Sequence, residues 1–404
     1  MNKANYRKGK RQEIITLLHY CGSIPYSAIN YLEENKKSRM YHASINKMQK
    51  EGVVKIEKKN GERQLVLKDY DELSPIYVKA IDEMYRDYYL RVGQTLRKIA
   101  LHNDKKDAGK VLQSNDMILL MYSIGVKTLP TDKADILNCD ELPQNVNMYY
   151  NSREIKKGTN YESIVEENNQ QKTVIGTRID GLLISNGGIY TIYNMRNKRY
   201  VWKVRGEERI KPYIEKLING KHPRFILEKN YECKDAILFA KQLSSFAKML
   251  TDSPQNDSFK DMIGLRTLYT NIYVLPSDIN GKMMLEIMMM KDWKNKMLSD
   301  LFDTSDEERN EAKHTSVVCD GYDEETKTYK LLFCIPNLAK LYMFSNRAKI
   351  EENQHVFEVY CFDFQAELVV AVTEGMVKVK KMPFEKYYQF IKEGEEITDE
   401  RISE

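Results

Sequence analysis

The chain has 404 residues, of which 42% are hydrophobic and 30% charged, and its formal net charge is +4. This length allows two or three globular domains, and the composition excludes a disordered tail. No apolar run approaches the ~20 residues that cross a bilayer, and the N-terminus lacks the apolar core of a signal peptide, so the sequence predicts a soluble, cytoplasmic protein without a membrane partner.

Charge is distributed unevenly along the chain. Residues 1–68 hold fifteen Lys/Arg against six Asp/Glu, a net of +9, and residues 176–230 hold twelve against five, a net of +7. The remainder therefore carries −12. Two basic segments in an acidic chain favour surfaces that meet a polyanion, although solvated lysine-rich surface is the alternative.

The first basic segment predicts three short helices. Apolar residues recur at helical spacing in residues 11–20, and Gly22 ends that helix. Ile24-Pro25 opens a second helix that extends to about residue 32. Ser38 is a residue type that caps helix N-termini, and it begins a third helix that runs to about residue 51.

The third helix has two faces of different character. Tyr41, Ile45 and Met48 follow the i, i+4, i+7 spacing and should face inward. The opposite face carries donors and small groups that suit the major groove of DNA. That face comprises Arg39, Ala43, Asn46 and Lys50, flanked by His42 and Lys47.

Residues 53–67 predict a basic β-hairpin, because Asn60-Gly61 is a strong signal for a two-residue turn. Its cations would contact phosphates, and they are Lys55, Lys58, Lys59 and Arg63. Three helices followed by this hairpin predict a winged-helix DNA-binding domain in residues 1–70. A winged helix used for protein contact is the alternative.

Residues 71–112 are expected to form a helical linker, with a long amphipathic helix over 75–103 that could serve as a spacer or a homodimer seam. A short helix capped by Ser114 or Asn115 should follow. Residues 177–195 predict a hairpin about a glycine turn, and a basic stretch leads from there into a further helix. That stretch supplies a second candidate DNA-contacting surface, made of Arg196, Lys198, Arg199, Lys203 and Arg205.

Helix, strands, helix and strand in this order, with Asp180 on the first hairpin strand, look like a restriction-endonuclease core over residues 113–250. That fold needs a carboxylate and a lysine on the next strand to hold Mg²⁺ and activate water. The next strand reads Tyr193-Asn194-Met195 instead, so the nuclease centre looks degenerate. Asp180 is the one candidate catalytic residue, and its alternative role is pairing with Arg178, Arg196 or Lys203.

The motifs R-x-D-G, a double-glycine turn, a Tyr-Asn strand and R-N-x-x-x-x-W-K-x-x-G-E resemble the replication-relaxation family of plasmids and integrative elements. The residues that carry this resemblance are Arg178, Asp180, Gly181, Gly187, Gly188, Tyr193, Asn194, Arg196, Asn197, Trp202, Lys203, Gly206 and Glu207. The resemblance implies a DNA-binding protein of a mobile element that acts in plasmid replication or conjugative transfer, with proteins of those processes as partners. It assigns no catalytic residue.

Residues 251–404 predict a further α/β segment. We expect an apolar helix just before it, over 235–243, a turn at Asn280-Gly281, a charged loop over 304–313 and a long strand region over 355–370. An acidic helix and tail should close the chain from residue 385.

The sequence thus predicts an α+β or α/β protein that binds double-stranded DNA at an origin-type site. Two alternatives remain at this point. One is a nickase or relaxase that would need Mg²⁺ at Asp180, and the other is a winged-helix transcriptional regulator. Six scattered cysteines, six histidines without a metal-binding spacing and the lack of a phosphate-binding loop predict no metal site and no cofactor.

Overall fold

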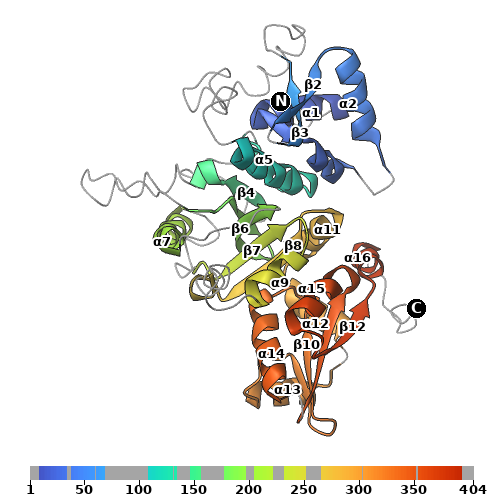
Figure 1. The fold of residues 1–404 in the computed structure, drawn as a ribbon. Helices are drawn as coiled ribbons and strands as arrows, with labels where there is room; N and C mark the ends of the chain where they lie inside the picture. Colours follow the sequence, from blue (N-terminus) through green and yellow to red (C-terminus); the bar gives the residue numbers. More distant parts are fainter. Residues whose placement is uncertain are drawn as a thin grey trace, which may run out of the picture. The chain divides into compact units, whose positions relative to one another are not determined.

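The computed structural model describes residues 9–33, 38–59, 61–68, 108–130, 132–133, 146–155, 177–196, 204–221, 232–251, 265–302, 304–351 and 354–393. These residues form a mixed α/β protein with three β-sheets (Figure 1). The chain divides into two compact units, Met1–Gly158 with Asn219–Lys229, and Thr159–Ile218 with Asn230–Glu404. No helix among the described residues is long and apolar enough to span a membrane.

The first unit begins with three helical segments and a three-stranded antiparallel sheet in the order β1-β3-β2. Its elements are α1 (Lys10–Cys21), β1 (Ser23–Pro25), the 3-10 helix η2 (Tyr26–Leu32), α2 (Met40–Lys50), β2 (Val54–Lys59) and β3 (Glu62–Leu67). The second helix was predicted to begin at Ile24-Pro25. Those residues instead form β1, because Ile24 pairs with Leu65 of β3 across the sheet.

The predicted first helix and the predicted hairpin are confirmed. The apolar residues of α1 are buried, and the helix ends at Gly22, whose φ of 75° suits glycine. Strands β2 and β3 pair from Val54↔Leu67 to Lys59↔Glu62. Gly61 supplies a positive φ of 82° in the turn, while Asn60 lies outside the described residues.

Helix α5 (Ala108–Ser123) and strand β4 (Met148–Asn151) also belong to the first unit. The helix begins before Ser114, so the predicted cap at Ser114 or Asn115 is wrong. Asn115 is buried, and its side-chain amide donates to the carbonyls of Cys21 (2.9 Å) and Ser23 (2.6 Å). It therefore fixes α5 to the junction of α1 and β1. The predicted helix over 75–103 lies outside the described residues.

A five-stranded mixed sheet has the order β4-β5-β6-β7-β8. Its strands from the second unit are β5 (Gly181–Ser185), β6 (Gly188–Arg196), β7 (Asp235–Ala240) and β8 (Asn271–Pro276). The predicted hairpin of β5 and β6 is confirmed, and β6, β7 and β8 run parallel. The predicted helix over 235–243 is wrong. Its apolar run lies between two parallel neighbours and is buried on both faces, a pattern that periodicity cannot distinguish from a buried helix.

Four helices of the second unit lie between or after these strands in the chain. They are α7 (Val204–Lys221), α9 (Ser244–Thr251), α11 (Ile279–Met288) and α12 (Trp293–Leu301). The predicted Asn280-Gly281 turn is the first turn of α11, where the Asp278 carboxylate accepts from both backbone N–H groups. Gly281 is required there, because a Cβ would lie 1.8 Å from the Pro276 carbonyl oxygen.

A second, four-stranded sheet has the order β12-β11-β10-β9. Its strands are β9 (Gly321–Asp323), β10 (Thr328–Leu332), β11 (Val356–Phe362) and β12 (Lys378–Met382), and the associated helices are α13 (Asp306–His314), α14 (Leu338–Glu351), η5 (Asp363–Gln365), α15 (Ala366–Thr373) and α16 (Phe384–Glu393). The predicted strand over 355–370 becomes helical after Phe362, where the Gln365 side chain accepts from the Phe362 amide (2.8 Å).

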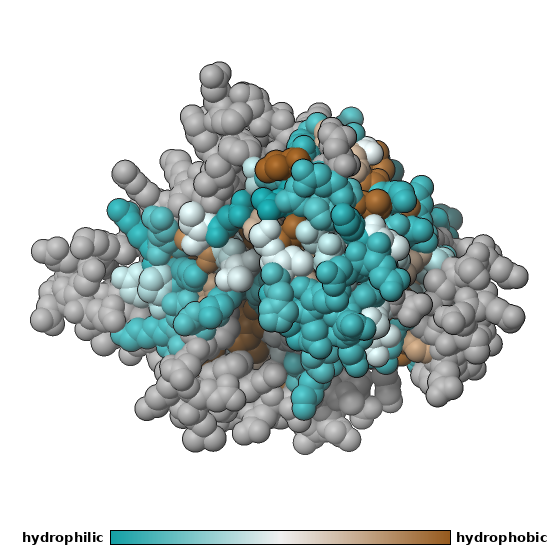
Figure 2. All heavy atoms as spheres, turned by 90° about the horizontal axis from the view of Figure 1, so that it is seen from below, coloured by the Kyte–Doolittle hydropathy of each residue, from teal (hydrophilic) through white to brown (hydrophobic). Residues whose placement is uncertain are grey.

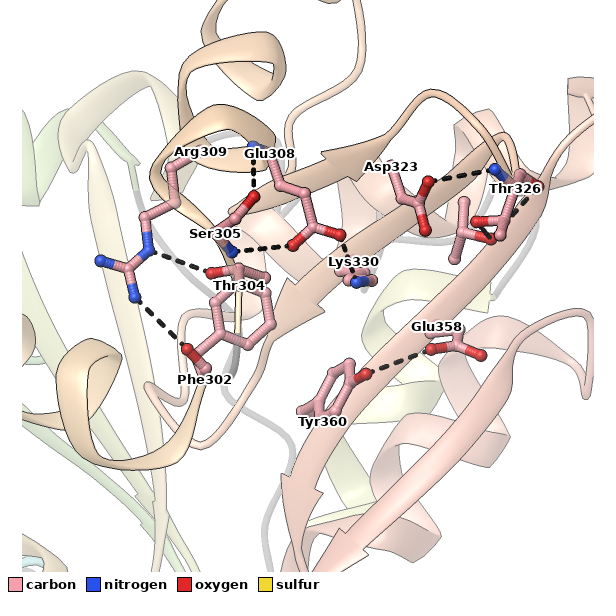
Figure 3. A network of polar contacts seen from close by, with 11 residues as sticks. Phe302, Thr304, Ser305, Glu308, Arg309, Asp323, Thr326, Lys330, Glu358 and Tyr360 are labelled. Carbon is pink, nitrogen blue, oxygen red and sulfur yellow. Dashed lines mark hydrogen bonds and ion pairs between the residues drawn. The ribbon is translucent and has the colours of Figure 1, made fainter.

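The charged segment predicted as a loop over 304–313 is mostly helix α13. Ser305 and Glu308 form a reciprocal capping box at its N-terminus (Figure 3). The Glu308 carboxylate also pairs with Lys330 of β10 at 2.6 Å, and Arg309 donates to Thr304 at 3.0 Å. The helix is therefore stabilised by its cap and by contacts to the sheet rather than by an apolar stripe.

Described side chains on the face shown in Figure 2 are mainly hydrophilic, with apolar groups that are small and separate. The exposed large apolar residues described in the second unit lie on different segments, and they are Val318, Ile350, Val370 and Met376. Scattered exposed residues of this kind are ordinary on protein surfaces.

Candidate nucleic-acid interface

Helix α2 has one buried face and one exposed face. Tyr41, Ile45 and Met48 are buried, as predicted. The exposed residues at its start and along its length are Arg39, Met40, Ala43, Asn46, Lys47, Gln49 and Lys50. No acidic residue occurs between Ser38 and Lys50, so the exposed face combines cations with small and apolar groups.

A buried carboxylate, not Ser38, caps the start of α2. The Glu33 side chain is 2% exposed and accepts from the backbone N–H groups of Met40 (3.0 Å), Tyr41 (3.0 Å) and His42 (3.3 Å). Ser38 donates its hydroxyl to the same carboxylate at 2.8 Å. The predicted Ser38 cap is therefore wrong, because the acid at the end of η2 takes the amides that a local cap would bind.

The environment of Glu33 favours its ionised form. Burial raises the carboxyl pKa, but hydrogen bonds from the His42 ring, Ser38 and the backbone amides of His42 and Tyr41 outweigh that effect and lower the pKa from its usual value. The positive end of the helix dipole also attracts a carboxylate at this position. Because Glu33 occupies these amides, a DNA phosphate cannot bind there, and any contact must come from side chains of α2.

Ion pairs and hydrogen bonds fix α2 against α1. Arg11 pairs with Glu51 just after the end of α2 at 2.6 Å, and the Tyr41 hydroxyl donates to Glu13 at 2.5 Å. Burial and the neighbouring Glu13 carboxylate raise the pKa of Tyr41, so its hydroxyl stays protonated. These contacts leave the outward face of α2 on a rigid support.

The Tyr26 ring contacts both the hairpin and α2. The Arg63 guanidinium lies over the Tyr26 ring at 4.6 Å, and the Tyr26 ring meets the His42 ring edge-on at 5.5 Å. His42 is half-buried, and its Nδ1 lies 3.0 Å from Glu33. Arg63 and His42, two of the predicted DNA-contacting residues, are therefore brought together.

The remaining hairpin cations differ in their surroundings. Lys55 pairs with Glu57 at 2.9 Å, and both side chains are exposed by about two-fifths. Lys58 is exposed on the same strand. Lys59 belongs to β2, but its side chain is outside the described residues. Lys58 and Arg63 are thus the exposed cations that the described hairpin presents.

The second predicted surface falls largely outside the described residues. This applies to Lys198, Arg199 and Lys203. Arg196 ends β6 and Arg205 lies in the first turn of α7, but the side chains of both are outside the described part.

Asp180 is 8% exposed and precedes β5 in the second unit. Its Oδ2 accepts from the backbone N–H of Asn194 at 2.6 Å, and its own N–H donates to the Ile192 carbonyl at 2.9 Å. Asp180 thereby fixes the β5–β6 pairing. Among the described residues, no group of three or more His, Cys, Asp or Glu side chains could hold a metal ion.

A buried acid to which the sequence analysis gave no role lies beside this hairpin. Glu207 of α7 is 1% exposed and accepts from Thr177 Oγ1 (2.8 Å), the Arg178 amide (2.5 Å) and the Tyr193 hydroxyl (3.1 Å). Tyr193 in turn bonds Tyr269 at 2.8 Å. Burial raises the Glu207 pKa, and the hydrogen bonds lower it by less. Its sequence signals were its place at the end of the R-N-x-x-x-x-W-K-x-x-G-E motif and in the first turn of a helix.

Comparisons with known proteins give no match: no protein-family model, curated protein or solved structure is similar to this chain.

Proposed function

We propose that the protein binds double-stranded DNA in a sequence-specific manner. Residues 9–68 would act as a winged helix, with α2 in the major groove and the β2–β3 hairpin along the phosphates. The observation that carries this proposal is the exposed face of α2, which has Asn46 among three cations and no acid. A face of this composition suits hydrogen bonding to bases beside a phosphate backbone.

The support beneath α2 favours DNA over a protein partner. Three backbone amides and two side chains converge on Glu33, so the helix is held in one orientation before any ligand arrives. Base recognition needs side chains placed within fractions of an ångström, and a rigid helix supplies that placement. Protein-binding surfaces, by contrast, are enriched in aromatic residues at their centre.

For the second unit we propose a restriction-endonuclease-like domain that does not cleave DNA. Asp180 is engaged by the Asn194 amide, and the neighbouring strand offers Tyr193 and Asn194 where a metal-dependent nuclease needs an acid and a lysine. A nickase that uses Asp180 would need further metal ligands beside it, and the described residues include no group of three or more His, Cys, Asp or Glu side chains that could hold a metal ion.

The biological role proposed here is recognition of an origin-type site on a mobile element, in plasmid replication or conjugative transfer. It rests on the resemblance of residues 178–207 to the replication-relaxation family. Footprinting on the DNA of the host element tests it, because the position of the protected site distinguishes an origin from a promoter. Protection confined to the protein's own promoter would instead favour a transcriptional regulator.

A salt titration of duplex affinity tests the binding surface. Arg39, Lys47, Lys50, Lys58 and Arg63 offer about five phosphate contacts, so the logarithm of affinity should fall with the logarithm of salt concentration at a slope of about −4.5. A slope of about −9 would mean that the five cations of the second basic surface also engage DNA. No binding to any duplex at low salt would reject the proposal.

A further inference from the structure

The exposed face of α2 contains an apolar strip that its fold does not need. Met40 is 52% exposed, the one exposed large apolar residue described in the first unit. Ala43 lies next to it on the helix surface and is also exposed. Asn46 is exposed three residues after Ala43, so it lies one further step around the exposed face. Elsewhere in α2 the large apolar residues point inward, so Met40 contributes little to the core.

Met40 is held at the surface rather than left loose. The Lys10 ammonium lies 3.0 Å from the Met40 sulfur and 4.9 Å from the centre of the Tyr41 ring. Lys10 therefore lies between the buried Tyr41 and the exposed Met40. The thioether is soft and adaptable, and it suits contact with an apolar group on a ligand.

We infer that α2 recognises A·T base pairs in the major groove, an inference that rests on the DNA binding proposed above. In that groove thymine presents a methyl group, and adenine presents an N7 acceptor beside an N6 donor. Met40 and Ala43 match the methyl group, and the Asn46 amide matches the adenine pair of donor and acceptor. Guanine would be read by a cation that points at the bases. Arg39 instead donates to the Ser38 carbonyl at 2.9 Å, and Lys47 and Lys50 lie further along the helix, where they suit phosphates.

The distance between these side chains along the helix is similar to the distance between neighbouring base pairs. Met40, Ala43 and Asn46 are three residues apart, which is about 4.5 Å along a helix axis. Base pairs are stacked about 3.4 Å apart. Three side chains at this spacing therefore reach two or three neighbouring base pairs of an A·T-rich core.

Selection from a duplex library with a randomised core tests the inference. The full-length protein should enrich an A·T-rich core. Within that core, deoxyuridine in place of thymidine should weaken binding about fourfold per contacted methyl group. Replacing the contacted adenine by 7-deazaadenine should weaken it by roughly tenfold or more.

Variants assign each contact to its residue. Met40→Ala should reduce the effect of deoxyuridine, because only the contact of Ala43 remains, while leaving the effect of 7-deazaadenine. Asn46→Ala should remove the effect of 7-deazaadenine and leave that of deoxyuridine. Gln49→Ala is the matched control, since Gln49 is exposed on α2 but lies to the side of this face, and it should keep both effects.

Each outcome is decisive. Enrichment of G·C-rich cores, or binding without sequence preference, overturns the inference and leaves DNA binding intact. The inference is also overturned if each modified base weakens binding by the same factor in wild type, Met40→Ala and Asn46→Ala. Failure to retain any duplex from the library at low salt rejects the proposed function itself.

Discussion

Glu33 in the first unit and Glu207 in the second are both buried glutamates, yet their pKa values move in opposite directions. Burial raises the pKa at both sites. Glu33 overcomes it with donors at a helix N-terminus and a histidine ring, whereas Glu207 has one backbone amide and two hydroxyls. The larger set of donors at Glu33 and the deeper burial of Glu207 both contribute to this difference.

The difference has a functional side. The first unit uses a buried charge to fix a helix whose polar groups face outward. In the second unit Asp180 and Glu207 are buried. Asp180 accepts a hydrogen bond from the Asn194 amide, and Glu207 accepts one from the Tyr193 hydroxyl. We propose that the first arrangement presents side chains to DNA, whereas the second stabilises the hairpin and helix that contain it.

The largest expected effect comes from Glu33→Ala. Its removal leaves three buried or half-buried amides without an acceptor, so the free energy of unfolding should fall by about 3 to 5 kcal/mol. Urea unfolding measures this loss, and amide exchange at residues 40–42 locates it. Glu51→Ala is the control, because its ion pair with Arg11 is partly exposed and should contribute less than about 1 kcal/mol. Equal effects of the two variants would contradict the role given to Glu33.

Asp180→Ala should destabilise the β5–β6 hairpin by about 1 to 3 kcal/mol, since the buried Asn194 amide loses its acceptor. The same variant separates a structural from a catalytic role. Wild type and variant should leave supercoiled plasmid equally intact with Mg²⁺ or Mn²⁺. Metal-dependent nicking by the wild type that the variant lacks would instead support the nickase.

Lys58→Ala should weaken binding to every duplex by a similar factor and reduce the salt slope by about one, because a phosphate contact carries no sequence information. Anisotropy titrations at several salt concentrations measure both quantities. Glu57→Gln on the same strand removes an acid that pairs with Lys55 and should not reduce affinity. A change in sequence preference for Lys58→Ala would place this residue at the bases instead.

The pH dependence of stability should show the opposite behaviour of the two glutamates. The contribution of Glu33 is present above the usual pKa of 4.5 and is lost as pH falls through its lowered folded value. The contribution of Glu207 is present below 4.5 and is lost as pH rises through its raised folded value. Glu207→Gln should therefore gain stability relative to wild type as pH rises, which unfolding curves at several pH values would detect. A relative loss would contradict the raised pKa.

Local patterns predicted much of the fold. Helical spacing placed the inner stripe of α2, and the Asn-Gly pair placed the β2–β3 turn. Strand β7 was missed because an apolar run of six residues has no period that separates a buried strand from a helix. The Glu33 cap could not be predicted, since its acid lies seven residues before Met40 and the contact depends on how η2 packs. The contacts of Glu207, a residue noted only as part of a motif, could not be predicted for the same reason.

Charge reversal on α2 tests the proposed interface most directly. Lys47→Glu with Lys50→Glu changes the exposed face of α2, and Lys378→Glu with Lys381→Glu makes the same change of charge on exposed residues of β12. Duplex affinity at constant salt should fall by about a hundredfold or more for the α2 pair and change little for the β12 pair. Equal losses for the two pairs, or unchanged affinity of the α2 pair, would contradict DNA binding through α2.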